Sequence, residues 1–295
     1  MGHNGTKIAT MKFDYGIQQL QLGKICKSEH DVQRALLTLS EAGYRSIELN
    51  GFMIRKTPFI AKLLLSLSGM GIKKSQRLNW QSLTRDCNFK VISIHEDIDT
   101  LENNFEEVEK EISIYGPRYI VITGLYQFAY DDEGELGKLI VRLNRIGREL
   151  SALGVGLLYH NHSVEFQNVD ETAKAYDILI DGLNPEWVNF EFDSYWCVEA
   201  GADPIYWMKR LGSRLKLYHI CDRGSRAKGP YMTPILKTDA MELGFGSMNL
   251  NEYVKLATEL GVNEIILEQH RNYFGGDPVA SAQKSAGFFR KMLEE

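Results

Sequence analysis

Short runs of apolar and β-branched residues alternate with longer amphipathic stretches along the whole chain. The short runs predict eight strands, over residues 15–20, 46–50, 91–95, 119–123, 156–160, 188–193, 215–221 and 264–269. The stretches between them predict eight helices, over 29–42, 58–69, 101–115, 133–153, 172–183, 203–211, 250–260 and 278–293. This alternation has no Pro-, Gly- or Ser-rich linker, so it predicts an α/β protein with a single (β/α)8 TIM-barrel domain over residues 1–295.

Glycines and two long connections complete the predicted outline. Gly43, Gly154 and Gly261 follow predicted helices, where a left-handed residue commonly ends the helix. The connections 70–88 and 222–248 are longer than the others. Segment 222–248 follows the seventh strand, on the face where barrel strands end, so we expect it to be a lid loop. Residues 1–12 are expected to be a frayed N-terminus.

Composition narrows the class of protein. The chain has 295 residues, of which 44% are hydrophobic, so it can bury a core without disulfides. The cysteines form no CxxC pair and are expected to be reduced thiols of a cytoplasmic protein. The net charge of −5 and the scattered basic residues count against a nucleic-acid partner. No apolar run approaches the length of a membrane span. The composition therefore indicates neither a nucleic-acid partner nor a membrane.

Polar side chains collect where the predicted strands end, and barrel strand ends converge on one cavity. Four of the seven histidines lie within a residue or two of such an end: His95, His160, His162 and His219. One inward-facing residue per strand predicts a ligand set of His160, Asp193, His219 and Glu268. Imidazole mixed with carboxylate suits Mn²⁺, Fe²⁺, Co²⁺ or Zn²⁺ better than Ca²⁺ or Mg²⁺.

Each of these residues also has an ordinary structural interpretation. A single histidine at a strand end is more often a hydrogen-bonded structural residue than a ligand. Aspartates after strands commonly cap the next helix, as we expect of Asp132 and Asp203. The coincidence of four candidates on strands five to eight favours the metal site.

Several motifs at these strand ends resemble one family. They are Ala42-Gly-Tyr-Arg-Ser-Ile-Glu-Leu, Val91-Ile-Ser-Ile-His95, Tyr159-His-Asn-His-Ser-Val-Glu-Phe166, Glu191-Phe-Asp-Ser-Tyr-Trp196, Leu217-Tyr-His-Ile-Cys-Asp222 and Ile266-Leu-Glu-Gln269. From about residue 15 to 289 the chain resembles the sugar phosphate isomerase/epimerase family. These are xylose-isomerase-like TIM barrels related to inosose dehydratases, ketose 3-epimerases and C-glycoside deglycosidase α-subunits.

The resemblance implies a metal held by one residue from each of strands five to eight. Carried over, the ligands are again His160, Asp193, His219 and Glu268. Many relatives have a Glu where this chain has His160, so Glu165 is the alternative ligand. Mn²⁺ is the expected ion, with Co²⁺, Fe²⁺, Zn²⁺ and Mg²⁺ as alternatives.

The resemblance also implies a reaction in carbohydrate metabolism. The metal-dependent enzyme would remove a proton next to a carbonyl or hydroxyl of a sugar or keto-sugar, giving isomerisation or epimerisation. The expected catalytic residues are His162, Glu165 and Glu268. The expected substrate-binding residues are His95, Asn161, Trp196 and Arg223, although Trp196 could equally be core packing.

The alternative within this class is β-elimination. The enzyme would then be a dehydratase, or a C-glycoside deglycosidase (a lyase) acting on a 3-keto-glycoside with a small partner subunit. His160 in place of a glutamate favours elimination, where one base suffices. A homo-oligomer is compatible with either reaction.

Two further classes of protein share this fold but fit the sequence less well. An apurinic endonuclease of this fold would need a trinuclear metal cluster and a basic groove, which seven histidines and net acidity supply poorly. A non-catalytic sugar-binding barrel would bind sugar without metal. A phosphate on the substrate has no Gly-rich loop to receive it, although basic residues lie near strands seven and eight: Arg223, Arg226, Lys228 and Arg271.

Overall fold

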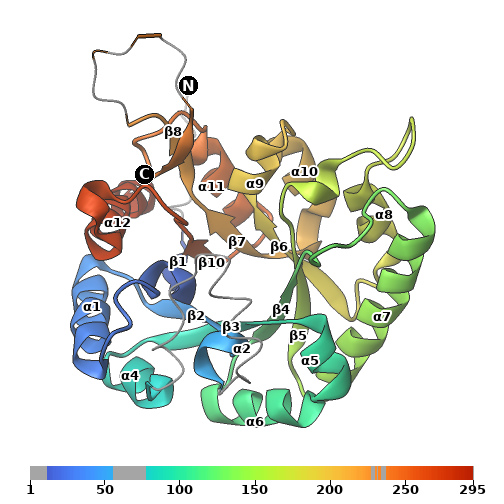
Figure 1. The fold of residues 1–295 in the computed structure, drawn as a ribbon, viewed down its shortest axis with the longest axis horizontal. Helices are drawn as coiled ribbons and strands as arrows, with labels where there is room; N and C mark the ends of the chain where they lie inside the picture. The colour runs from blue at the N-terminus through green and yellow to red at the C-terminus, as the bar shows by residue number, and fades with distance from the viewer. Residues whose placement is uncertain (1–11, 56–77, 227–229, 231, 234–236, 295) are drawn as a thin grey trace, which may run out of the picture.

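The computed structural model describes residues 12–55, 78–226, 230, 232–233 and 237–294 and shows a closed barrel of eight parallel strands (Figure 1). Around the barrel the order is β1, β10, β7, β6, β5, β4, β3 and β2. The strands are β1 Asp14–Gln18, β2 Ser46–Asn50, β3 Lys90–Glu96, β4 Tyr119–Thr123, β5 Gly156–His160, β6 Val188–Asp193, β7 Leu215–Ile220 and β10 Glu264–Leu267. The predicted fold class is confirmed.

Helices surround the barrel on its outside (Figure 1). The α-helices are α1 Glu29–Ala42, α2 Gly51–Ile54, α4 Trp80–Asp86, α5 Ile98–Asn103, α6 Phe105–Tyr115, α7 Glu133–Ala152, α8 Ala175–Gly182, α9 Ser194–Glu199, α10 Pro204–Leu211, α11 Leu250–Glu259 and α12 Pro278–Glu294. Short 3₁₀ turns include η1 Gln19–Leu22 and η3 Val164–Phe166. No helix in the described part of the chain is both long and apolar enough to cross a membrane.

Local signals account for most of these boundaries. Gly43, Gly154 and Gly261 have φ of 108°, 76° and 94°, the left-handed conformation predicted for them. Asp132 and Asp203 cap α7 and α10 by accepting hydrogen bonds from the backbone N–H of residues 135 and 205. All four cysteines are free and buried, as expected.

The predicted helix over 101–115 is wrong, because the structure divides it in two. Asn104, with φ of −139°, interrupts the helical backbone between α5 and α6. Asp97 begins α5 three residues earlier than predicted by accepting the Thr100 N–H at 2.8 Å. An apolar pattern that continues through both helices hides such a break.

Three short helices were missed: α2, α4 and α9. They have four to seven residues, too few for the helical period to stand out. Helix α4 lies within the long connection 70–88 and begins where Asn79 accepts the Ser82 N–H. The predicted helix 58–69 lies outside the described residues.

Segment 222–248 carries an antiparallel hairpin of β8 Asp222–Gly224 and β9 Asp239–Met241. The Asp222 carboxylate accepts backbone N–H groups from Gly244, Gly246 and Met248 at 2.9–3.2 Å. These bonds fasten the end of the segment to its beginning. Its expected role as a lid stays a prediction. In the expected frayed N-terminus, residues 1–11 lie outside the described residues.

Substitutions of two glycines in α7 can measure how closely this helix packs on the barrel. A Cβ on Gly147 would lie 2.8 Å from both the Trp187 carbonyl oxygen and Val188 Cγ2, whereas one on Gly137 would meet nothing within 4 Å. Gly147→Ala is expected to lower the free energy of unfolding by about 1–3 kcal/mol. Gly137→Ala should raise it by up to about 1 kcal/mol, because alanine favours the helix. Denaturant titration of both variants checks this, and equal effects would contradict it.

Candidate metal centre and active site

Four residues predicted as ligands meet where neighbouring strands end. His160, Asp193 and His219 end or lie in β5, β6 and β7, and Glu268 follows β10. All four are buried, and their potential ligand atoms lie within 4.8 Å of one another. His219 Nδ1 is 3.1 Å from Glu268 Oε2 and 3.9 Å from Asp193 Oδ2. We call these four residues the outer group. That they bind a metal stays a prediction.

The chemistry of the outer group fits a divalent cation. Two carboxylates and two imidazoles offer mixed nitrogen and oxygen donors and up to two negative charges. All four side chains are buried, so little water competes for a bound ion. Burial raises the pKa of Asp193 to about 8, and the nearby Glu268 carboxylate adds to this effect. A buried carboxylate that is costly to ionise gains from a cation beside it. The same aspartate caps α9 by accepting the Trp196 N–H at 3.1 Å.

Next to the outer group lies a second layer of which only His95 was predicted from the sequence as a site residue. Glu191 Oε2 is 2.9 Å from His160 Nδ1 and 3.1 Å from His95 Nε2. Glu48 Oε1 is 2.8 Å from His219 Nε2 and 2.7 Å from His95 Nε2. We call Glu48, His95 and Glu191 the inner layer. It gives one nitrogen of each outer histidine a carboxylate partner.

That pairing decides which nitrogen of each outer-group histidine is free to bind a metal. An N–H donated by His160 Nδ1 to Glu191 leaves Nε2 as the ligand atom of that ring, and an N–H donated by His219 Nε2 to Glu48 leaves Nδ1. Carboxylates in this position fix the tautomer and orientation of metal-binding histidines.

The ligand atoms of His95, His160, Glu191 and His219 also lie within 4.8 Å of one another. In this second group, His95 and His160 already pair with the Glu191 carboxylate. The outer group therefore fits a cation better than the second group does.

A sequence signal for the inner layer exists. Glu191 precedes Asp193 by two residues and Glu48 precedes Asn50 by two, so each points to the same side of its strand as the residue at the strand end. A carboxylate inside an otherwise apolar barrel strand is the signal. Its partner could not be read from the sequence, because Glu48 and His219 are 171 residues apart.

The two predicted catalytic residues after β5 differ in exposure. His162 is partly exposed, and its ring centroid lies 5.2 Å from that of His160. Burial lowers its pKa to about 3. Glu165 is fully buried in η3, where it accepts hydrogen bonds from the Tyr159 hydroxyl at 2.8 Å and the His162 N–H at 2.9 Å. Glu165 belongs to neither group of potential ligand atoms, which favours His160 as the strand-five ligand.

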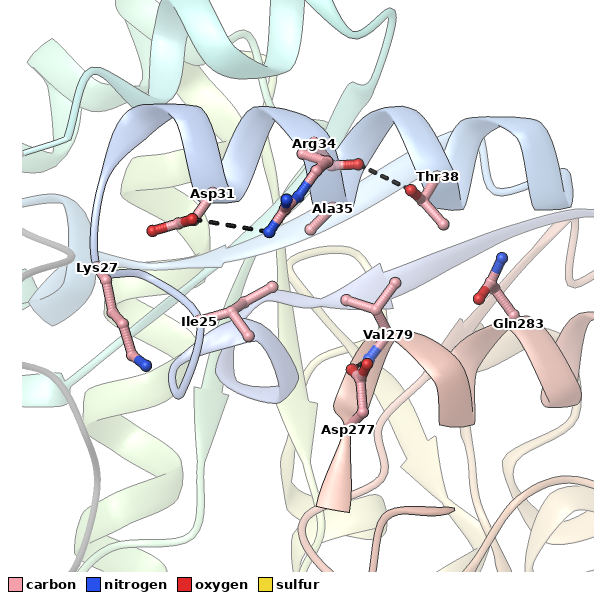
Figure 2. A pocket seen from close by; sticks show the side chains of 9 residues that line it. All are labelled: Ile25, Lys27, Asp31, Arg34, Ala35, Thr38, Asp277, Val279 and Gln283. Atoms are coloured by element: carbon pink, nitrogen blue, oxygen red, sulfur yellow. Dashed lines mark hydrogen bonds and ion pairs between the residues drawn. The ribbon is translucent and has the colours of Figure 1, made fainter. Parts of the chain in front are cut away.

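A cavity of about 700 Å³ opens beside the outer group. His95, His160, His162 and Glu268 border it, and the rest of its wall comes mainly from the ends of β1 to β4. A second cavity, of about 430 Å³, lies between α1 and the start of α12 (Figure 2). Its charged side chains include Asp31 and Arg34, 3.9 Å apart, and it contains none of the predicted site residues. The chemistry therefore belongs to the first cavity.

Comparison with known proteins identifies the family. The model of the xylose isomerase-like TIM barrel family matches residues 37–292. The chain belongs to this family. The resemblance predicted from the strand-end motifs is thereby confirmed.

Individual relatives of this xylose isomerase-like barrel are distant. An inosose dehydratase of Mesomycoplasma hyopneumoniae (strain 7448) is 25% identical over 205 residues, which is 64% of this chain and 61% of that protein, less than two thirds of its length. A sugar phosphate isomerase/epimerase structure from Parabacteroides distasonis ATCC 8503 has a TM-score of 0.72 at 21% identity, covering 98% of both chains. A structure of the IOLI protein with a binding zinc atom has a TM-score of 0.66 at 15% identity, covering 95% of this chain and 98% of that one.

Of the four predicted substrate-binding residues of this xylose isomerase-like barrel, only His95 lines the large cavity. The Asn161 side chain donates to the Asp193 carbonyl and accepts the Asp193 N–H, both at 3.0 Å, so it ties β5 to β6. The Trp196 ring contacts the rings of His162 and His270, with centroid separations of 5.4 and 5.0 Å. Arg223 pairs with Glu199 at 2.7 Å and does not line the cavity.

Glu165 is expected to make the stability of this barrel depend on pH. Burial raises its pKa from 4.5 to about 7 in the folded protein, so the unfolded chain releases this proton first as pH rises. The contribution of Glu165 to the free energy of unfolding should therefore fall by about 3 kcal/mol from pH 4.5 to 7 and stay level above that range. The free energy of unfolding of Glu165→Gln should fall by about that much less than that of the wild type over this range. Denaturant titrations across this pH range test it; equal slopes in both proteins would contradict it.

Proposed function

We propose that this protein is a divalent-metal-dependent enzyme that removes a proton from carbon next to a carbonyl of a sugar or keto-sugar. The observation that carries the proposal is the outer group, buried at the ends of four adjacent strands, with His160 and Glu268 bordering a cavity. The names of similar proteins, a dehydratase and an isomerase/epimerase, support this reaction class.

The outer group would hold the cation, with Mn²⁺ as the first candidate and Zn²⁺ supported by the zinc in the IOLI structure. A bound cation supplies electrostatic stabilisation for the negative charge that develops on adjacent substrate oxygens. The inner layer orients the two histidine ligands. Asn161 acts as a positioning residue, because its hydrogen bonds hold the backbone of Asp193.

Proton transfer falls to residues on two sides of the cavity. Glu268 borders it from the β10 side and His162 from the β5 side. Glu165 lies behind His162 and has a pKa of about 7, which suits a group that holds a proton reversibly at neutral pH. Glu165 Oε1 also approaches Gly124 of the cavity wall, since a Cβ there would lie 2.7 Å from it.

Isomerisation or epimerisation follows if the proton returns to the neighbouring carbon or to the opposite face. A second outcome, β-elimination, is favoured by one observation. Strand five contributes the imidazole of His160 to the outer group, so the centre lacks a symmetric pair of carboxylates on strands five and eight. Elimination needs only one base, and a similar protein is named an inosose dehydratase, the name of an eliminating enzyme. A 3-keto-glycoside substrate falls under this second outcome.

The test is deuterium exchange in D₂O with Mn²⁺-loaded protein and a panel of an inosose, ketoses and a 3-keto-glucoside. Mass spectrometry should detect carbon-bound deuterium that depends on the metal and is lost in Glu268→Gln. An epimer or isomer supports the first outcome, and a product lighter by one water or by an aglycone supports the second. Metal-loaded protein that binds these compounds without exchange or product would contradict the proposal.

A further inference from the structure

The large cavity extends well beyond the outer group. The strands of the outer group, β5, β6, β7 and β10, are consecutive in the barrel order, and β1 to β4 form the other half of the ring. Most residues lining the cavity lie at or just after the ends of β1 to β4. Its volume of about 700 Å³ lies within the range of sites for drug-sized ligands, roughly 300–1,000 Å³. A single sugar ring beside the outer group would leave much of this space unused.

Six apolar residues line the part of the wall away from the outer group, among polar residues of the same strand ends. We call these six residues the apolar arm, and they are Leu20, Phe52, Ile98, Ile122, Leu125 and Tyr126. They come from η1, α2, α5, β4 and the loop after β4. Tyr126 stands at the rim with a relative exposure of 91%, the most exposed tyrosine among the large exposed apolar residues of the described chain. Apolar surface gathered on one side of a cavity is typical of a ligand site.

Three polar residues beside the apolar arm, Gln18, Asp97 and Arg142, are engaged with the protein itself. Gln18 Oε1 accepts the Asn50 side-chain N–H at 3.0 Å and the Leu20 N–H at 2.6 Å. Asp97 accepts both the N–H and the hydroxyl of Thr100. Arg142 donates twice to Glu102, at 3.0 and 2.6 Å. Sugar hydroxyls buried against these three residues would lose water without gaining equivalent hydrogen bonds, whereas an apolar group would gain from burial against the apolar arm.

We propose that the apolar arm binds an apolar substituent of aromatic size, so that the substrate is an aryl glycoside or a similar aryl-substituted sugar. Its sugar faces the outer group and its aryl group lies against the apolar arm. This inference rests on the proposed function for the position of the sugar. The preference for an aryl group depends only on the cavity wall.

Binding of paired glycosides tests the apolar arm. The probes are phenyl and methyl β-glycosides of glucose, galactose and xylose, titrated calorimetrically into the full chain loaded with Mn²⁺. At least one phenyl glycoside is expected to bind about tenfold or more tightly than its methyl partner, from burial of the ring. Phe52→Ala and Tyr126→Ala should reduce this ratio to about threefold or less. Tyr126 is exposed, so its variant is expected to fold even if the Phe52 variant does not.

Tyr206→Ala on α10 is the matched control, because Tyr206 is an exposed aromatic residue (55%) that does not line the cavity. It should keep the wild-type ratio. Equal affinities for phenyl and methyl glycosides, undetectable binding of every phenyl glycoside, or an unchanged ratio in both arm variants would overturn the proposal.

Repeating the titration after chelation separates the two proposals. An aryl preference that persists without metal supports the apolar arm even if the deuterium-exchange test of the enzyme fails. Exchange into small sugars with no aryl preference would overturn the apolar arm alone.

Discussion

Asp193→Ala is expected to purify nearly free of metal and to lose deuterium exchange. The substitution removes one of only two carboxylates from the outer group. Losing a ligand should weaken metal binding by more than about 100-fold, since even residues behind the ligands contribute 10–100-fold. Exchange should fall by about a thousandfold, because the cation contributes several kcal/mol of charge stabilisation. Elemental analysis after gentle purification and the exchange assay measure the two effects.

Asp203→Ala provides the matched control. Asp193 also caps α9, so its loss should lower the free energy of unfolding by about 1 kcal/mol for that reason alone. Asp203 caps α10 in the same way, through the Ile205 N–H at 3.0 Å, and is absent from the outer group. Its variant should show a similar loss of stability with full metal content. Metal retained at the wild-type level in Asp193→Ala would refute the ligand assignment.

Glu191→Ala is expected to damage both metal binding and stability. Its carboxylate lies within 3.3 Å of nitrogen atoms of His95, His160 and His219. Without it, His160 loses the partner that orients it and His219 keeps only Glu48 at its Nε2, so metal affinity should fall about 10–100-fold. The inner layer also keeps buried charges without their counterpart, which should cost about 3–5 kcal/mol of unfolding free energy. Competition with a chromophoric chelator and denaturant titration measure these quantities.

Glu264→Gln separates a general effect of a buried carboxylate from an effect on the site. Glu264 begins β10, at the opposite end of the barrel from the outer group, and accepts a hydrogen bond from the Ser46 hydroxyl. Its variant is expected to lose some stability and to keep wild-type metal affinity. If Glu191→Ala bound metal as tightly as wild type, the inner layer would not orient the ligands.

Local sequence patterns predicted most of the fold and the outer group of the site, but not Glu48 and Glu191 of the inner layer. Strands and helices have side-chain periods of two and 3.6 residues, so their alternation predicted the barrel within a few residues of its observed boundaries. Because parallel barrel strands all end on one face, the positions of His160, Asp193, His219 and Glu268 predicted that they would meet. The limits of local pattern appear at α4 and α9, which are too short to show a period.

The tertiary structure decided the contacts between strands that are not neighbours. Glu48 on β2 reaches His219 on β7 with β1 and β10 between them, and His95 on β3 reaches Glu191 on β6. Such pairs depend on how the closed barrel turns each side chain into its interior. The apolar arm likewise exists only where the ends of β1 to β4 come together, and Arg223 pairs with Glu199 instead of lining the cavity. The sequence determined which residues reach the barrel mouth, because strand direction and period are local properties; closure of the barrel decided which of them touch.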